Sequence, residues 1–372
     1  MTLFLRTEAS IVIKFVIMRA ACLVCFLGFI GGSIAWSEST PREALLVLSK
    51  GDHTLAIVDP ATLKVVAKAP VGEDPHEVIA STDGKFAYVS NYGGGAYNTL
   101  TLIDLIGQKR VTSIDLGPLR GPHGLAFVGG KTWFTAEAAK AIGRYDPAKK
   151  AVDWILGTGQ NRTHMIYVSA DMKRIYTTNV SSGTISLIEK SSRTGFGGPP
   201  PPGAGPGGPP PGGRRGPMGP PGGDWDETVV RVGRGAEGFD VSPDGKELWA
   251  ANAQDGTVSI VDLTAKKVTD TLQANVPGAN RLKFTPDGKL VLISSLGDAG
   301  LAVLDAGTHK EVKRIDLGRG AAGIQMQPDG SHAYVACTGG NYVAVIDLKT
   351  LEMSGRINAG PGPDGLAWAI RR

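Results

Sequence analysis

Short apolar runs of strand length alternate with turn signals along most of the chain, and residues 75–104 show the pattern most clearly. A polar pair opens this stretch, a short apolar run follows, and residues 82–85 form an Asp-Gly turn signal. A strand-like run over 86–91 comes next, and a glycine-rich loop leads to an alternating strand that ends at Asp104. Three strands and two turns within one short stretch predict a repeated β unit.

The same unit recurs seven times between residues 44 and 370. In six units the residue that ends the second strand precedes the acid that ends the third strand by ten positions, as Ser49 precedes Asp59. The unit at 75–104 differs, because thirteen positions separate Asn91 from Asp104. Turns of the Pro-Asp-Gly kind join the first two strands in several units, because Pro and Gly supply the backbone angles of tight hairpins.

A fourth strand follows the acid, as in residues 109–116, 267–272 and 311–317. Four antiparallel strands per unit are typical of a propeller blade, so the sequence predicts an all-β, seven-bladed β-propeller. The chain begins in the middle of a unit at Ala44 and finishes with a lone first strand over 363–370. We expect this last strand to join the three N-terminal strands and close the ring, which removes open sheet edges.

These motifs carry a family resemblance. The strings AYVSN at 87–91 and VID at 345–347, the Pro-Asp-Gly turns and the period are similar to those of the YVTN-type, or YncE-like, seven-bladed β-propeller family. Residues 121–135 also resemble the repeats of streptogramin-lyase-like propellers, and seven-bladed lactonases are similar in architecture. The resemblance implies the fold and leaves the activity open, since one fold hosts many functions.

Residues 1–35 are predicted to be an export signal peptide. An uncharged apolar segment at 20–30 is followed by a small-x-small cleavage pattern at 33–35, which is typical of such leaders. Met1 and Met18 are both candidate start residues, and an uncleaved N-terminal anchor is the alternative interpretation. We therefore expect a periplasmic or secreted protein.

The predicted organisation is a linker over 36–43 and a single propeller domain over 44–370, with an insert at 193–223. The insert is almost entirely Gly and Pro, so it cannot bury apolar area and is predicted to be a disordered or partly polyproline loop. It is either a tolerated surface insertion or a tether to another envelope protein. We expect a monomer with no integral membrane segment after signal cleavage.

Composition narrows the partners. The formal net charge is +4 and charged residues make up 20% of the chain, so no nucleic-acid partner is implied. A small molecule or an envelope protein is expected instead. Cys22 and Cys25 lie in the predicted leader, which leaves Cys337 alone in the mature chain, where it is predicted to be a packed residue.

The candidate chemistry lies at the start of the first strand of each blade, which lines the central channel of a propeller. Counting back from the aligned positions gives one residue per blade: His76, His123, His164, Glu237, Asn280, Ala322 and Asp364. Half of the six histidines therefore fall on three consecutive blades, and Glu237 follows. This set of four suits a divalent transition metal with a coordination position open for water or substrate. The alternative is a polar channel lining that holds ordered water.

Loops between the second and third strands emerge on the same face and carry further candidate ligand-binding residues. These are Asn91, Tyr92, Asn179 and Asn252, beside Tyr97 and Glu137. Aromatic walls and polar donors fit a small-molecule pocket. Each Asn taken alone is better explained as a turn cap.

Three functions are open at this point. The first is an exported binding module that engages a ligand or a protein partner at the histidine-bearing face. The second is a metal-dependent lactonase-like or lyase-like enzyme, in which the histidines position metal or substrate and Glu237 is a ligand or a general base. The third is an accessory protein of a periplasmic redox system, with the insert as a tether. Any function is expected on the side of the ring that runs from His76 to Glu237.

Overall fold

The computed structural model describes residues 39–191, 225–298 and 300–372. The predicted signal peptide at 1–35 and the predicted insert at 193–223 lie outside the described residues. The rest of the predicted propeller domain is described almost throughout. Within the described ranges, no helix has the length and apolar character that a membrane crossing requires.

Strands make up nearly all of the regular structure. In chain order the elements are β1 (Glu43–Ser49), β2 (Thr54–Asp59), β3 (Lys64–Pro70), β4 (Pro75–Ala80), β5 (Phe86–Asn91), η1 (Gly93–Gly95), β6 (Thr99–Asp104), β7 (Lys109–Asp115), β8 (Pro122–Val128), β9 (Lys131–Ala136), β10 (Ala141–Asp146), β11 (Ala151–Gly157), β12 (Thr163–Val168), β13 (Arg174–Asn179), β14 (Thr184–Lys190), β15 (Trp225–Arg231), β16 (Ala236–Val241), β17 (Glu247–Asn252), β18 (Thr257–Asp262), β19 (Lys267–Leu272), β20 (Ala279–Phe284), β21 (Leu290–Ser295), β22 (Gly300–Asp305), β23 (Glu311–Asp316), β24 (Ala321–Met326), β25 (His332–Cys337), η2 (Thr338–Gly340), β26 (Tyr342–Asp347), β27 (Glu352–Ile357) and β28 (Pro363–Ile370).

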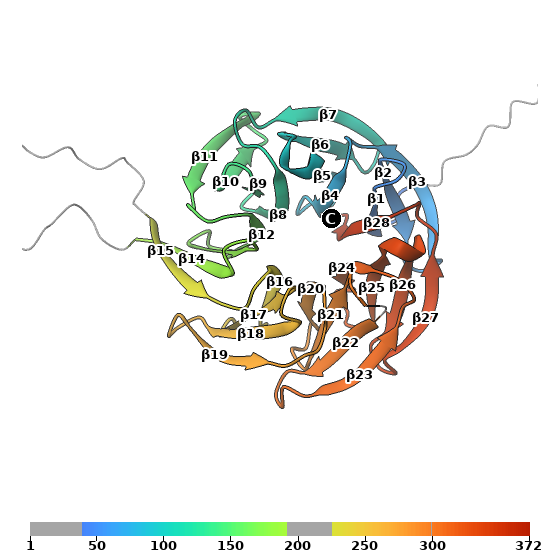
Figure 1. Cartoon of the computed structure of the whole chain (residues 1–372). Coiled ribbons are helices and arrows are strands. Elements are labelled where there is room, and N and C mark those ends of the chain that lie inside the picture. Colours follow the sequence, from blue (N-terminus) through green and yellow to red (C-terminus); the bar gives the residue numbers. More distant parts are fainter. Residues whose placement is uncertain (1–38, 192–224, 299) are drawn as a thin grey trace, which may run out of the picture. The chain divides into compact units, whose positions relative to one another are not determined.

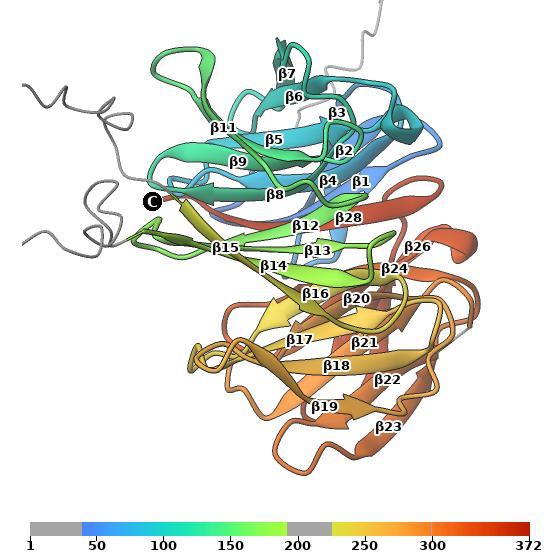
Figure 2. The same cartoon turned by 60° about the vertical axis from the view of Figure 1, so that its left-hand side comes forward.

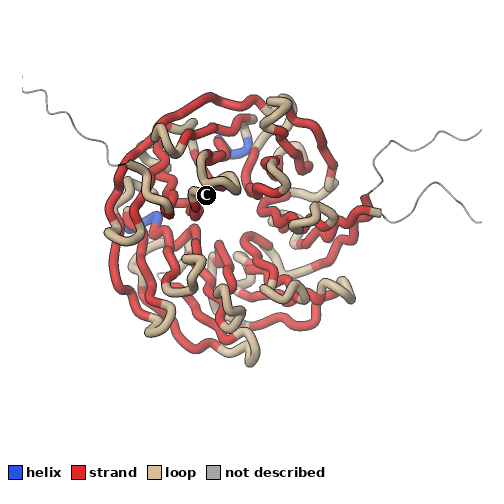
Figure 3. Tube along the Cα trace, turned by 180° about the vertical axis from the view of Figure 1, so that it is seen from behind, coloured by secondary structure: helices blue, strands red, loops and turns tan. Residues whose placement is uncertain are grey.

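These strands form seven four-stranded antiparallel sheets, which confirms the predicted seven-bladed β-propeller (Figure 1). Blade 1 has the order β28-β1-β2-β3, and blades 2 to 7 follow in chain order from β4. The last strand pairs antiparallel with β1, so that Ala44 faces Ala369 and Leu46 faces Ala367. The expected ring closure by the C-terminal strand is therefore confirmed. Figure 2 shows the strands of each blade side by side, and Figure 3 shows the ring from behind.

The hydrophobic core lies between the blades. Buried apolar side chains form seven clusters, and each cluster joins two neighbouring blades. Trp133 and Trp249, for example, are fully buried at the contacts of blades 3 with 4 and 5 with 6. Each blade packs its two faces against its two neighbours. Closing the ring therefore buries apolar area between every pair of neighbouring blades and leaves no blade with an uncovered face. Cys337 is buried in one of these clusters, as expected.

The acid that ends the third strand has a structural role in at least four blades. Asp59, Asp104, Asp262 and Asp347 each accept a hydrogen bond from a backbone N–H two residues later, at 2.8–2.9 Å. This contact closes the turn into the fourth strand in the manner of an Asx-turn. These acids therefore belong to the blade architecture and lie at the opposite end of the third strand from the loops that carry the candidate site.

Candidate functional site

The seven residues predicted at equivalent positions do occupy one position of the fold, because each is the second residue of the innermost strand of its blade. The ladder between this strand and the next is irregular there in every blade, as between Pro122 and Leu125 in blade 3. A bulge of this kind bends the strand and re-aims a side chain out of the regular alternation. We call these seven residues the axial ring.

The structure brings four members of the axial ring together. The imidazole centroids of His76 and His123 are 4.9 Å apart, and those of His123 and His164 are 3.8 Å apart. Glu237 Oε2 lies 2.7 Å from His164 Nε2. This approach is an ion-pair contact without hydrogen-bond alignment, since Nε2 has no hydrogen-bond partner among the described residues.

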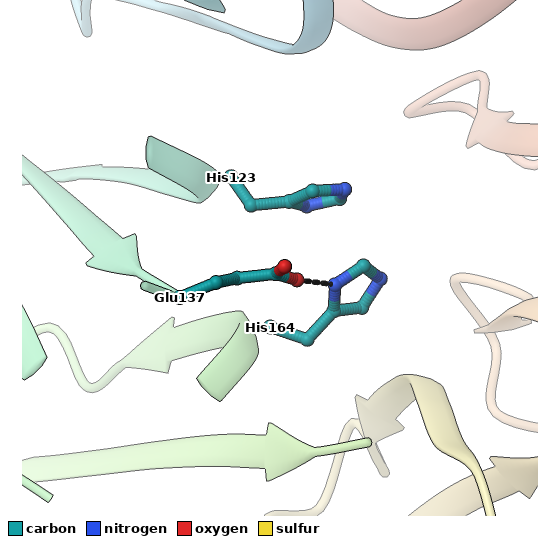
Figure 4. A group of neighbouring side chains, drawn as sticks. All are labelled: His123, Glu137 and His164. Carbon is teal, nitrogen blue, oxygen red and sulfur yellow. Dashed lines mark hydrogen bonds and ion pairs between the residues drawn. The ribbon is translucent and has the colours of Figure 1, made fainter. Parts of the chain in front are cut away.

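Glu137, a loop residue, lies at the centre of this group. Its Oε1 contacts His164 Nδ1 in a short hydrogen bond, and its Oε2 accepts a short hydrogen bond from the Tyr92 hydroxyl. Arg162 Nε approaches the same oxygen at 3.4 Å. Figure 4 shows Glu137, from the end of β9, between His123 at the start of β8 and His164 at the start of β12. We call His76, Tyr92, His123, Glu137, Arg162, His164 and Glu237 the axial site.

A second repeated position explains why Glu137 is there. In blades 1 to 3, the residue directly after the second strand contacts the axial-ring residue of the next blade. Lys50 Nζ lies 2.8 Å from His76 Nε2, the Tyr92 ring is 5.2 Å from that of His123, and Glu137 bonds His164. The sequence predicted Tyr92 as a ligand-binding residue and pointed to Glu137 only as a loop residue beside it. Counting one position past the aligned residue in every blade would have found this second set.

His123 is buried and uncharged. Its side chain is 2% exposed, and its Nδ1 has no hydrogen-bond partner among the described residues. Burial, followed by the charges on His164 and His76, lowers the pKa of His123 well below the ordinary histidine value, because a second cation there would be desolvated and repelled. A neutral imidazole with a free nitrogen is the form that binds metal ions.

His164 and its two carboxylates form the charged part of the site. Burial opposes the charged imidazole, but Glu237 and Glu137 outweigh it and raise the pKa of His164. For Glu137, burial likewise acts upward, yet the contacts with His164 and Tyr92 hold its pKa below the ordinary value. In Glu237 the charges of His164 and Arg162 overcome burial and lower the pKa to about 2. A carboxylate so weakly basic is a poor general base near neutral pH.

Three of these groups lie close enough together that they could hold a metal ion. One donor atom each from His123, Glu137 and His164 can be chosen so that all three lie within 4.8 Å of one another, and all three side chains are buried. Two imidazoles and one carboxylate suit Zn²⁺ and similar transition metals better than Mg²⁺ or Ca²⁺, which prefer oxygen ligands. This group shares His123 and His164 with the predicted metal set, which also includes His76 and Glu237.

His76 and Asp364, two other members of the ring, contact one cation, Lys50. Lys50 Nζ contacts Asp364 Oδ2 at 3.1 Å and Asp74 Oδ1 at 3.4 Å in addition to His76. The hydrogen bond and charge of His76 lower the pKa of Asp74 despite its partial burial. His76 Nε2 is therefore engaged with Lys50, whereas His123 Nδ1 has no hydrogen-bond partner among the described residues.

A buried ion pair crosses the axis one residue further along the inner strands. Arg281 of β20 and Glu77 of β4 form a short contact, and their side chains are 7% and 11% exposed. Blades 6 and 2 are not neighbours in the ring, so this pair joins opposite sides of it. Arg281 Nη1 also donates to Asn280 Oδ1 at 3.2 Å. The sequence analysis did not identify either partner, and Asn280 and Ala322 carry no contact to the histidines.

The remaining predicted ligand-binding residues point into their own blades. Asn91, Asn179 and Asn252 are buried and each donates from Nδ2 to two hydroxyl groups of the third strand of the same blade, at 2.9–3.1 Å. Tyr97 is exposed and donates to Glu73 Oε2 at 2.6 Å. The asparagine contacts join side chains of neighbouring strands and do not cap a turn backbone, and we do not include these residues in the axial site.

A groove of about 540 Å³ lies elsewhere, at the edge of blades 4 and 5. Its lining includes Arg231, Asp255, Thr257 and Gln273, and no member of the axial site. We place the candidate chemistry at the axis because buried ionisable groups converge there. In addition, none of the residues that line the groove has a buried side-chain nitrogen without a hydrogen-bond partner.

Comparisons with known proteins agree with the fold. A sequence model of the YNCE-like beta-propeller family matches residues 224–328. No curated protein matches the chain significantly. Among solved structures, Kuenenia stuttgartiensis hydrazine synthase is similar with 17% identity and a TM-score of 0.59, over 79% of this chain and 89% of that chain.

Two further solved structures have the same architecture. A Bacteroides uniformis protein named "putative 6-phosphogluconolactonase" has 15% identity and a TM-score of 0.67, over 88% of this chain and 100% of that one. The dihydro-heme d1 dehydrogenase NirN, solved in complex with DHE, has 16% identity and a TM-score of 0.58, over 87% of this chain and 65% of that one. At such identities the likeness shows the fold alone. The chain is thus a seven-bladed β-propeller whose residues 224–328 match the YNCE-like family, as the resemblance of its repeats predicted.

Proposed function

We propose that this propeller is a binding module that holds a divalent transition-metal ion at the axial site and offers an open coordination position to a small molecule. The observation that carries the proposal is the buried imidazole of His123, whose Nδ1 has no partner among the described residues. Such an atom costs free energy unless something outside the chain binds it. A metal ion shared with Glu137 and His164 would satisfy it, and ordered water is the alternative occupant.

The donor set also supports an open site. Three protein ligands of the His-His-Glu kind leave at least one position of a zinc-like ion free, whereas structural zinc sites use four protein ligands. Coordination by His164 Nδ1 would replace its hydrogen bond with Glu137, so both donors would turn from each other to the shared ion. Nε2 of His164 would then face Glu237 Oε2, now 2.7 Å away. Metal-bound histidines commonly donate their second nitrogen to such a carboxylate.

The enzymatic interpretation receives less support. A bound metal would activate water, but the low pKa of Glu237 makes it a weak partner for proton transfer. The lactonase name belongs to a neighbour that shares only the fold. Export, a monomeric state and an envelope partner remain predictions from the sequence.

Matched carboxylate variants test the proposal. Protein purified without a His tag and reconstituted with Zn²⁺ is expected to retain about one ion per chain by elemental analysis. Glu137→Gln should lose that ion because a ligand is removed. Glu237→Gln should keep the stoichiometry with affinity lowered about 10- to 100-fold, as for other residues that orient a ligand.

Either of two results would overturn this assignment. One is wild-type protein without stoichiometric Zn²⁺ after reconstitution. The other is a Glu137→Gln variant that binds Zn²⁺ as the wild type does. Circular dichroism of both variants should show the wild-type strand signal, so that loss of metal is not loss of fold.

A further inference from the structure

A third repeated position lies two residues before each axial-ring residue, in the loop that enters the inner strand. The backbone is left-handed there in all seven blades. Glycine occupies five of the seven positions, with φ between 52° and 75°: Gly121, Gly235, Gly278, Gly320 and Gly362. The two exceptions are Asp74, with φ 48°, and Arg162, with φ 58°.

The two exceptions lie beside the histidines. Asp74 precedes His76 and Arg162 precedes His164, whereas the glycines lead into His123 and into the other ring residues. A left-handed conformation is free for glycine and costs energy for other residues, although Asp tolerates it. Other non-glycine residues of this chain adopt it at other turns, such as His53, Lys140 and Asn341. At this position, however, Arg162 stands in place of the glycine that the fold favours. The departure brings a cation to the axial site.

Arg162 is held loosely and remains accessible. Its side chain is 41% exposed, with Nε 3.4 Å from Glu137 Oε2 and Nη1 3.5 Å from Glu237 Oε1. Charge-assisted hydrogen bonds of this type are usually 2.7–2.9 Å long. Arg281 differs in both respects, since it is buried and closely paired with Glu77. Lys50, the other nearby cation, already contacts Asp74, His76 and Asp364.

We infer that Arg162 recognises the carboxylate of a small organic acid whose other contact is the open position of the metal ion. This inference rests on the proposed function. A guanidinium matches a carboxylate in a planar, two-pronged geometry. Carboxylate oxygen is also a good donor to divalent ions. A dianion such as phosphate is disfavoured relative to a monoanion, because Glu137 and Glu237 both contact Arg162 and would repel the larger charge more strongly.

Acetate is the simplest probe of this inference. The full chain, purified without a tag and loaded with Co²⁺, should change its visible absorption when acetate is added, and acetamide at the same concentration should not change it. Arg162→Gln should keep the Co²⁺ stoichiometry and weaken acetate binding about 10- to 100-fold, the usual range for losing a hydrogen bond to a charged group. Arg162→Lys should weaken it less, since the charge remains.

Arg234 provides the matched control. It lies in the corresponding loop of the next blade, is 77% exposed and pairs with Asp255, so Arg234→Gln should leave acetate binding unchanged. Co²⁺ binding with no acetate response, or equal acetate affinity in wild type and Arg162→Gln, would overturn the inference and leave the metal site standing. Stronger binding of phosphate than of acetate would overturn the choice of a carboxylate. Failure to bind Co²⁺ would overturn both this inference and the proposed function.

Discussion

The two sides of the propeller have the same backbone and different chemistry. On one side, the axial-ring residues of blades 2 to 4 are histidines, and each is met by Lys50, Tyr92 or Glu137 from the preceding blade. On the other side, the corresponding loop residues are Val180, Ala253, Leu296 and Thr338, and the ring includes Asn280 and Ala322. Thr338 still reaches the next blade, but it donates to the backbone oxygen of Pro363.

The comparison shows how a symmetric scaffold builds an asymmetric site. One ring position alone places side chains around the axis, but it does not pair them. A candidate cluster arises in blades 2 to 4, where the ring residue and the loop residue of the preceding blade are both large and polar. The left-handed residue before the ring is also polar in blades 2 and 4, whereas blade 3 keeps Gly121 there. From the opposite side, Arg281 supplies a structural contact to Glu77.

The largest expected effect concerns that structural contribution. Arg281→Ala should reduce the free energy of unfolding by about 3–5 kcal/mol, because it leaves Glu77 buried without its partner. The change is measured by chemical denaturation. Folded Arg281→Ala should still bind one Zn²⁺ per chain, since Arg281 is not among the proposed ligands.

A double variant controls for this loss. Glu77→Leu combined with Arg281→Met removes both charges and should recover most of the stability, because an apolar pair of similar volume avoids the desolvation cost. A loss below about 1 kcal/mol in Arg281→Ala, the level of an exposed ion pair, would contradict a structural role for this side of the ring.

A smaller effect tests the departure at the left-handed position. Arg162→Gly and Arg162→Gln both remove the charge, but only glycine relieves the conformation at φ 58°. The glycine variant should be more stable than the glutamine variant by about 0.5–1 kcal/mol, after allowance for the greater freedom of glycine in the unfolded chain. Denaturant midpoints compared at equal slope measure this difference. Equal stability, or a more stable glutamine variant, would mean that Arg162 carries no conformational cost.

Most of the fold could be predicted from the sequence. The spacing of Ser49 and Asp59, and its recurrence, gave the seven blades, and the lone strand at 363–370 gave the closure that β28 makes with β1. The equivalence of His76, His123 and His164 also followed from counting. These features depend on local pattern and period, which a single sequence contains.

The pairing of side chains could not be predicted in the same way. Glu137 and His164 come from different blades, and Arg281 meets Glu77 from the far side of the ring. Such contacts depend on how the bulges aim the inner strands and on which long side chains reach across the axis. Counting positions along each blade shows neither the aim of the inner strands nor the reach of the side chains. The sequence therefore points to Glu237 as a ligand from its position in the ring. In the structure, Glu137 is the carboxylate whose donor atom lies close to donor atoms of both His123 and His164.

The most direct test compares alanine substitutions at equivalent ring positions on the two sides of the propeller. Zn²⁺ affinity is measured by competition with a chromophoric chelator for tag-free wild type, His123→Ala and Asn280→Ala, which alter equivalent positions of blades 3 and 6. We expect His123→Ala to lower the affinity at least about 100-fold, or about 2.7 kcal/mol, and Asn280→Ala to leave it unchanged. Equal affinities in the three proteins would contradict the claim that the chemistry of this propeller is concentrated on its histidine side.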